Sequence, residues 1–256
     1  MANSVYFSLL DWIYPPKCIS CGMIFAPVHG EPTQWICENC EPLLEPIPDP
    51  VCPICGYPTT EGFDCPSCKN KKMHYDIHRA AFVYDGVLRD LLHDIKFRSK
   101  RRTAQGLGAV LAETIINWNI NGDLIIPIPL HPSKKRSRGF NQASVLALPF
   151  SKSLKIPMAD NMIKRVKRTA PQSNLTPIAR EQNLQNAFSL NTRKYNPRNK
   201  QIILIDDIYT SGATMNACTK ILKDHGADKI ICISLSLAVS KKSDNFNPHT
   251  NTMEVF

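Results

Sequence analysis

Four pairs of cysteines stand out in this chain as residues whose type and spacing could do chemistry. Each pair has the form Cys-x-x-Cys, and all four fall within residues 18–68 of the 256-residue sequence. Two thiolates separated by two residues can point at one metal ion, and two such pairs complete a tetrahedral Cys₄ zinc site. We therefore predict two structural zinc ions, paired in sequence order on Cys18, Cys21, Cys37 and Cys40, and on Cys52, Cys55, Cys65 and Cys68.

Other uses of these cysteines agree less well with the sequence. A disulfide framework suits secreted chains, but residues 1–14 lack a basic start and a small-residue cleavage site. An iron–sulfur cluster also takes four thiolates, but pairs this far apart suit zinc better. An interleaved pairing of the four pairs stays open. We expect His29 and His74 to be bystanders, and the ribbons to be structural rather than in contact with nucleic acid.

A second group of polar residues follows the apolar run 202–205. Two acids come first, and a short loop of small residues then leads into a helical pattern. Backbone N–H groups of such a loop and of a helix N-terminus form a cradle for an anion. Two carboxylates next to such a cradle would repel the phosphate itself. Their expected partners are sugar hydroxyls or a hydrated Mg²⁺ ion. The expected ligand is a ribose phosphate, with its 5′-phosphate on Thr210, Ser211, Gly212, Ala213 and Thr214 and its 2′- and 3′-hydroxyls on Asp206 and Asp207.

The elements that must position these residues alternate between strand and helix. Apolar spacing predicts strands over 80–84, 123–130, 201–205 and 229–239, and helices over 87–97, 106–118, 141–154 and 214–225. The run 201–205 has no polar alternation, which is typical of a strand buried on both faces of a parallel sheet. Ligands of open α/β sheets bind at the carboxyl ends of the strands. We therefore expect an α/β protein with an open parallel sheet.

Charge and cysteine content both change near residue 75. Residues 1–75 hold eight acidic and four basic side chains, a net charge of −4, and residues 76–256 hold 14 acidic and 27 basic side chains, a net charge of +13. This change predicts a small double zinc-ribbon domain over 1–75 and a larger domain over 76–256. The hydrophobic content of 43% excludes a disordered chain. No apolar run is long enough to span a membrane, and we expect a cytoplasmic protein.

The segment 202–214 resembles the 5-phosphoribosyl-1-pyrophosphate (PRPP) motif of type I phosphoribosyltransferases. The resemblance implies a type I phosphoribosyltransferase-like open parallel sheet, PRPP bound with Mg²⁺, and a catalytic role for Asp206 and Asp207. Purine phosphoribosyltransferases carry a third acid at the position of Thr210, so a purine acceptor is disfavoured. No residue stands out as a general base, and the sequence does not indicate the acceptor.

Two further segments, 127–142 and 165–188, extend the resemblance over nearly the whole chain. Together with the cysteine pairs and the start F-x-x-L-L-D-W-I-Y-P-P-x-C, they resemble the ComF family of ComFC- and GntX-like proteins. That family joins a double zinc ribbon to a phosphoribosyltransferase-like domain. It implies a part in DNA uptake for natural transformation, with PRPP and single-stranded DNA as partners and a helicase or recombination protein as a further partner.

Basic residues fall in three groups. One resembles the pyrophosphate loop (Lys134, Lys135, Arg136 and Arg138), and another resembles a hood that closes over the site (Arg165, Lys167, Arg168, Gln172 and Arg180). Cations there would stabilise departing pyrophosphate, and we expect catalytic roles for Arg136, Arg138 and Arg168. The third group, 96–102, has no place in this scheme and is expected to meet DNA phosphates. Phe97 within it either stacks on a base or, as is more usual, lies in the core.

Two functions from different classes follow. The first is a phosphoribosyltransferase, a glycosyltransferase with an unknown acceptor. The second is a non-catalytic module that senses PRPP, or binds DNA, for a helicase or recombination partner. Cys218 and Cys232 follow the motif and are expected to be buried apolar residues in either case.

Overall fold

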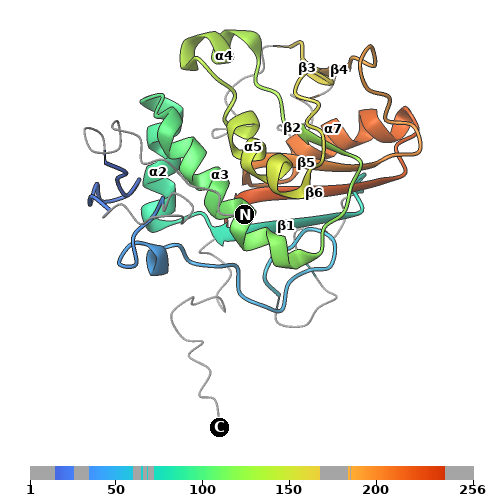
Figure 1. Ribbon diagram of the computed structural model, residues 1–256. Helices are drawn as coiled ribbons and strands as arrows, with labels where there is room; N and C mark the ends of the chain where they lie inside the picture. Colours follow the sequence, from blue (N-terminus) through green and yellow to red (C-terminus); the bar gives the residue numbers. More distant parts are fainter. Residues whose placement is uncertain are drawn as a thin grey trace, which may run out of the picture.

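The centre of the molecule is a sheet of four parallel strands in the order β1-β6-β5-β2 (Figure 1). This computed structural model describes residues 15–25, 35–59, 65, 68, 72–167, 184 and 186–239. The strands are β1 (Ile77–Val83), β2 (Leu124–Pro127), β5 (Gln201–Tyr209) and β6 (Lys229–Leu237). The helices are α2 (Gly86–Phe97), α3 (Arg101–Ile115), α4 (Pro132–Arg138), α5 (Gln142–Leu154) and α7 (Ala213–Asp224). The open parallel sheet predicted from the sequence is confirmed.

Strand β5 is buried on both faces, as its unbroken apolar run predicts. Ile203 and Ile205 pack into a core with α2, α3 and α5. Ile202 and Leu204 point the other way and pack with α7. Successive side chains of a strand alternate between faces, so a strand with helices on both sides needs apolar residues at every position.

The chain leaves two neighbouring strands toward opposite faces of the sheet. After β2 it enters α4 and α5, and α5 packs in the core on the first face. After β5 it enters α7, which packs in the core on the second face. The ends of β2 and β5 therefore border a topological switch point, where open α/β sheets bind their ligands.

Segment 132–138, which the resemblance implied to be a loop, is instead the short helix α4. Pro132 occupies the first turn, and the His131 side chain accepts a hydrogen bond from the Ser133 N–H at 3.2 Å. Gly139 ends the helix with a φ of 83°. Proline at the start and glycine just past the end are helix boundary signals, and these outweigh the repulsion among the basic side chains.

Helix α3 begins five residues before its predicted start at Gly106. The buried residues of its first turn are the small side chains Thr103 and Ala104, and not the large apolar side chains on which the prediction relied. The basic run 96–102 is thereby split between the end of α2, a short connection and the start of α3. Its cations cannot act as one flexible patch.

Four short elements complete the described part of the fold. Strands β3 (Ile163–Arg165) and β4 (Phe188–Leu190) form an antiparallel pair that the sequence did not predict. The 3₁₀ turns are η1 (Glu41–Leu43) and η2 (Ile116–Trp118). Within the described residues, no helix combines the length and the apolar character needed to cross a membrane.

Candidate functional site

The eight cysteine thiols of residues 18–68 form two groups, and the Sγ atoms within each group all lie within 4.8 Å of one another. The Sγ–Sγ distances are 3.7 Å for Cys21 and Cys37, and 3.5 Å for Cys55 and Cys65. Four sulfurs about 2.3 Å from a tetrahedral zinc ion lie about 3.8 Å apart, whereas a disulfide needs about 2.05 Å. The thiols therefore fit two zinc ions and not a disulfide framework.

The groups settle the pairing that the sequence left open. They are Cys18, Cys21, Cys37 and Cys40, and Cys52, Cys55, Cys65 and Cys68, in sequence order. In each ribbon a glycine closes the first turn, because Gly22 and Gly56 donate backbone hydrogen bonds of 3.0 Å to Cys18 and Cys52. Both glycines have a positive φ, which favours glycine.

The first ribbon packs on helix α3. A side chain at Gly106 would lie 2.8 Å from Trp35 and 3.0 Å from Ile19, so only glycine allows this approach. The guanidinium of Arg102 lies 5.4 Å from the Trp35 ring centroid, within the range of a cation–π contact. Arg102 thus supports the first ribbon from within the basic run.

The second ribbon packs on strand β1, an edge strand of the sheet. The backbone N–H of His78 donates to Ile54 at 2.6 Å. The Arg79 guanidinium donates to the backbone oxygens of Cys52 at 3.2 Å and Pro53 at 3.1 Å. These bonds use polar groups of β1 that an uncovered edge would expose.

The two acids of the motif lie inside β5, which continues to Tyr209 rather than ending at Ile205. The Asp207 N–H donates to Asp206 Oδ1 at 2.9 Å, and the Ser236 hydroxyl donates to the Asp207 backbone oxygen at 3.1 Å. Burial, and then the neighbouring Asp207 carboxylate, raise the pKa of Asp206 well above its usual value. Ionisation of both carboxyl groups of the ligand-free pair is therefore unfavourable.

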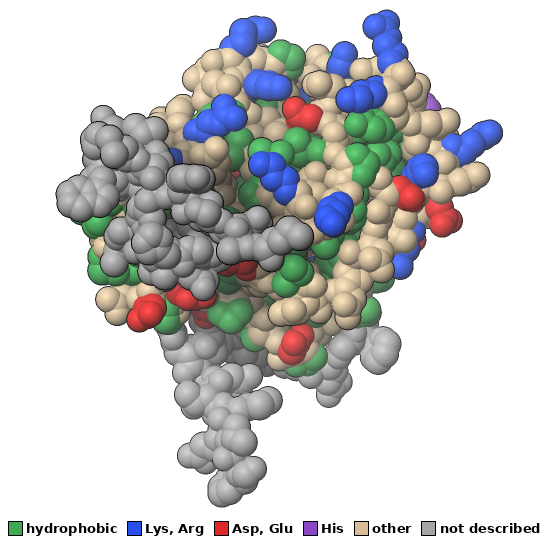
Figure 2. Space-filling view, in the orientation of Figure 1, with side chains coloured by type: hydrophobic (Ala, Val, Ile, Leu, Met, Phe, Trp, Pro, Cys, Tyr) green, Lys and Arg blue, Asp and Glu red, His purple; other side chains and the backbone are tan. Residues whose placement is uncertain are grey.

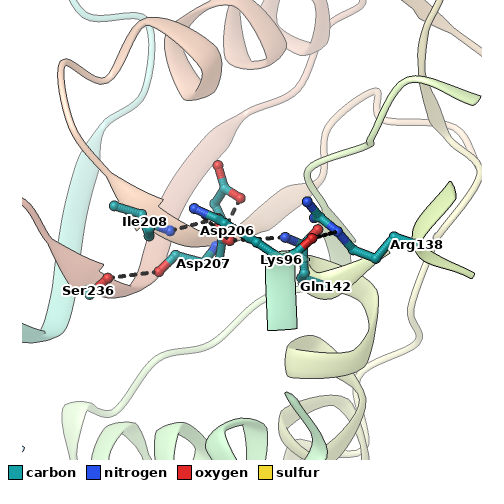
Figure 3. Close-up of polar contacts among 7 residues, drawn as sticks. All are labelled: Lys96, Arg138, Gln142, Asp206, Asp207, Ile208 and Ser236. Carbon is teal, nitrogen blue, oxygen red and sulfur yellow. Dashed lines mark hydrogen bonds and ion pairs between the residues drawn. The ribbon is translucent and has the colours of Figure 1, made fainter. Parts of the chain in front are cut away.

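Three side chains from three different helices gather on one side of the acid pair (Figure 3). The Lys96 ammonium lies 3.5 Å from Asp207 Oδ2, and the Gln142 amide donates to the same oxygen at 3.4 Å. Arg138 donates from Nε to the Lys96 backbone oxygen at 3.2 Å. Burial lowers the pKa of Arg138, and the Asp207 charge opposes that shift.

Lys96 is a site residue that the sequence reasoning assigned to the DNA-binding run instead. Its position carried a signal, since Leu88, Leu92 and Lys96 follow one another at intervals of four residues. That spacing puts all three on one face of α2, and Leu88 and Leu92 are fully buried. Lys96 therefore extends the buried stripe toward the site.

Of the predicted phosphate residues, Thr210, Ser211 and Gly212 form the turn between β5 and α7, and Ala213 and Thr214 are the first two residues of α7. Gly212 caps the helix with a φ of 74° and has no side chain to satisfy the first N–H groups. Those N–H groups and the helix dipole attract anions. A side chain at Gly212 would overlap the Tyr209 hydroxyl and lie 2.8 Å from its Cζ atom.

The other residues singled out in the sequence differ in how deeply they are buried. Arg136 is exposed on α4, and its catalytic role stays a prediction. Arg165 is half-buried in β3 with its guanidinium 5.6 Å from the Phe188 ring centroid. Phe97 is 72% exposed, so a place in the core is wrong. Cys218 and Cys232 are fully buried, as expected. Arg168, Gln172, Arg180 and His29 lie outside the described residues.

Two family models match the chain, one on each side of residue 75. Residues 9–69 match the double zinc ribbon domain. Residues 135–256 match the phosphoribosyl transferase domain. With the parallel sheet and the two Cys₄ groups, these matches establish a phosphoribosyltransferase-like α/β fold preceded by a double zinc ribbon.

Curated relatives match over most of their length. "Competence protein F" of Haemophilus influenzae is 30% identical over 224 residues, which cover 84% of this chain and 93% of the relative. "DNA utilization protein YhgH" of Escherichia coli K12 is 28% identical over 83% of this chain and 93% of the relative. "Competence protein ComFC" of Bacillus subtilis is 25% identical over 77% and 81%.

Solved structures are more distant. The structure of an allosteric regulatory enzyme of purine biosynthesis has a TM-score of 0.36 and 18% identity, over 52% of this chain and 25% of that one. This similarity is too weak to support a conclusion by itself. The sequence matches to the relatives, over most of their length, and to both family models show that the chain belongs to the competence protein F (ComF) family.

Proposed function

We propose that the chain binds PRPP with Mg²⁺ at the switch point between β2 and β5 and transfers its phosphoribosyl group during DNA uptake. One observation carries this proposal: the Asp206–Asp207 pair lies near the end of β5, and the glycine-capped N-terminus of α7 follows after one short turn. A carboxylate pair and an anion cradle are thereby placed at the end of one strand and the start of the next helix. PRPP carries both a 5′-phosphate and neighbouring ribose hydroxyls, and so matches both halves.

The polar groups divide between the parts of this ligand. The α7 N-terminus would hold the 5′-phosphate. The carboxylates of Asp206 and Asp207 would accept hydrogen bonds from the ribose hydroxyls and face Mg²⁺, a hard cation that prefers oxygen ligands. Lys96 and Arg138 lie on the Asp207 side and would stabilise the charge that develops on pyrophosphate as it leaves.

The biological role is proposed from the relatives. Their names refer to competence in Haemophilus influenzae and Bacillus subtilis, and to DNA utilization in Escherichia coli. If the acceptor of the phosphoribosyl group is DNA or one of its breakdown products, the transfer reaction would be part of DNA uptake. A helicase or recombination protein is the partner that we propose for such a chain.

Lys96→Gln is expected to weaken binding of PRPP with Mg²⁺ by roughly 10-fold, because a hydrogen bond or ion pair to a charged group contributes about 1.5–3 kcal/mol. Isothermal titration calorimetry of wild type and variant measures this change. Arg98→Gln is the matched control, since Arg98 is exposed two residues away and pairs with Asp94 at 3.1 Å. Wild-type protein that binds no PRPP would refute the proposed function, and equal affinity for Lys96→Gln would remove Lys96 from the site.

A specific surface favours a second function, the binding of single-stranded DNA. On the face shown in Figure 2, Lys and Arg side chains gather over the upper part, and most Asp and Glu side chains lie lower. Lys134, Lys135 and Arg136 are exposed on α4, and Phe97 is exposed at the end of α2. Exposed cations and an exposed aromatic ring are side chains that suit phosphates and stacked bases.

Charge reversal by Lys100→Glu with Arg101→Glu is expected to weaken single-stranded DNA binding about 10-fold or more, and to lower its dependence on salt. Fluorescence anisotropy at several salt concentrations measures both effects. Arg102 is left unchanged because it packs over Trp35. Lys152→Glu with Lys155→Glu changes the same net charge at the end of α5 and should have a smaller effect. Equal losses in both double variants would argue against a defined DNA surface.

A further inference from the structure

Tyr209 supports the phosphate turn from beneath. It is the last residue of β5 and is 3% exposed. Its hydroxyl lies against the Gly212 backbone, where any added side chain would overlap it. The same hydroxyl forms a 2.7 Å hydrogen bond with the hydroxyl of Tyr75. Movement of Tyr209 would therefore displace the turn that caps α7.

His78 connects Tyr209 to the second ribbon. Its ring stacks on the Tyr209 ring with centroids 3.9 Å apart and planes 22° apart. Its Nδ1 lies 2.7 Å from the backbone oxygen of Cys55, and its Nε2 lies 3.0 Å from the Ser234 hydroxyl. Because a carbonyl oxygen only accepts, Nδ1 carries the proton and donates to Cys55. The ring is fully buried and thus held between a zinc ligand residue and the support of the phosphate turn.

A second connection joins the first turn of α7 to the same ribbon. The Asn216 side chain accepts a 2.6 Å hydrogen bond from the His74 N–H. It also donates a 3.0 Å hydrogen bond to the Lys72 backbone oxygen. Lys72 and His74 follow Cys68, the last ligand of the second site, by only a few residues. The helix that begins at the phosphate turn is therefore tied to the chain leaving that site.

The first ribbon has a different neighbourhood. Its buried cysteines Cys18, Cys37 and Cys40 belong to the core formed with α2, α3 and α5. Cys52, Cys55 and Cys65 of the second ribbon belong to the opposite core, which also contains Tyr75, Tyr209 and α7. The two Cys₄ sites are thus alike in chemistry and unlike in what they touch.

We propose that the second Cys₄ site and the phosphate turn form one coupled unit, in which Tyr209, Tyr75, His78 and Asn216 are positioning residues. Metal bound at the second site holds the backbone of Cys55 and the nearby residues 72–74 in place, and these hold Tyr209 and α7. Insofar as it concerns PRPP affinity, this inference rests on the proposed function. The first site takes no part in the coupling.

Coupling between two binding sites is reciprocal. PRPP with Mg²⁺ is therefore expected to slow zinc release from one of the two sites and leave the other unchanged. Zinc transfer to a chromophoric chelator, followed with and without PRPP, measures this directly. Release that is the same with bound PRPP as without it would overturn the coupling.

Two variants cut the connections. Tyr209→Phe keeps the stacking on His78 but loses the hydroxyl pair, and Asn216→Ala loses both bonds to the segment after Cys68. Each is expected to weaken PRPP binding roughly two- to tenfold, as expected for the loss of one or two hydrogen bonds, and to reduce the protection of zinc. Tyr195→Phe removes a hydroxyl from the segment before β5, outside the contacts that connect the turn to the second ribbon, and should change neither. Full protection by PRPP in both connection variants would refute their positioning role.

A measurement without PRPP separates this inference from the proposed function. Cys68→Ser opens the second site and is expected to speed hydrogen–deuterium exchange in residues 208–216. Cys21→Ser opens the first site in the same way and should leave that exchange unchanged. If Cys68→Ser fails to fold, wild type treated with chelator until one zinc has left gives the same comparison. If PRPP does not bind, the proposed function fails, while unchanged exchange in 208–216 would refute the coupling itself.

Discussion

Replacing Asp206 by Asn is expected to weaken PRPP binding about 10- to 100-fold, because a hydrogen bond from a ribose hydroxyl to a charged acceptor contributes about 1.5–3 kcal/mol. The same change is expected to raise the melting temperature of the ligand-free protein. Burial and the Asp207 carboxylate disfavour the charged form of Asp206, and the neutral amide has nearly the same shape. Calorimetry with PRPP and thermal unfolding without it measure the two effects.

The pH dependence has a definite sign. The pKa of Asp206 is raised in the folded state, so folding favours the protonated carboxyl. The stability that this proton contributes is fully present below the unfolded pKa and is lost as pH rises through the higher folded pKa. Asp206→Asn should therefore gain stability over wild type as pH rises, by about 2–4 °C in melting temperature for each kcal/mol relieved.

The matched control is Asp228→Asn, since Asp228 is exposed before β6 and away from the motif. It should change neither PRPP affinity nor the pH dependence. A lower melting temperature for Asp206→Asn at all pH values would mean that the charged carboxyl stabilises the ligand-free fold. Such a result would contradict the expectation that the Asp206 carboxylate, which is needed for PRPP binding, destabilises the ligand-free protein.

Zinc removal is expected to have the largest effect on stability. Structural zinc contributes about 10–16 kcal/mol of apparent free energy in zinc-finger peptides. The cysteines of each ribbon belong to a core shared with the sheet and helices. Loss of even a third of this energy would lower the melting temperature by about 10 °C. Thermal unfolding with and without a strong chelator measures the change.

Two buried cysteines provide a matched comparison. Cys55→Ser should lose one of the two zinc ions and much of the stability. Cys232→Ser should keep both ions and lose little, although Cys55 and Cys232 are equally buried. Zinc content by mass spectrometry and melting temperature report on each variant. Two zinc ions retained in Cys55→Ser would contradict the ligand set of the second site.

The sequence by itself determined the features that depend on neighbouring residues. The Cys-x-x-Cys pairs fixed the metal chemistry, because the spacing of two residues alone brings both sulfurs of a pair to one ion. The unbroken run 202–205 predicted a strand buried on both faces. These are local rules of backbone and side-chain direction, and the structure confirms the two Cys₄ groups and the buried strand.

The positions at which helices begin and end were harder to predict from the sequence. Segment 132–138 resembles a loop of phosphoribosyltransferases, but its own capping signals, Pro132 and Gly139, make it a helix. Helix α3 was predicted too short because its first turn buries Thr103 and Ala104 rather than large apolar residues. The domain boundary near residue 75 stays a prediction, and both Cys₄ groups share cores with the larger part of the chain.

Only the tertiary structure decided which distant residues meet. Lys96, Arg138 and Gln142 come from three helices, and they gather on the Asp207 side of the acid pair because those helices converge on one end of the sheet. The stacking of His78 on Tyr209 joins positions 131 residues apart, since β1 and β5 both flank β6. No periodicity or local spacing encodes such contacts, because they depend on strand order and on how the helices pack. The sequence supplied the chemistry of each site, and packing decided which of its residues act together.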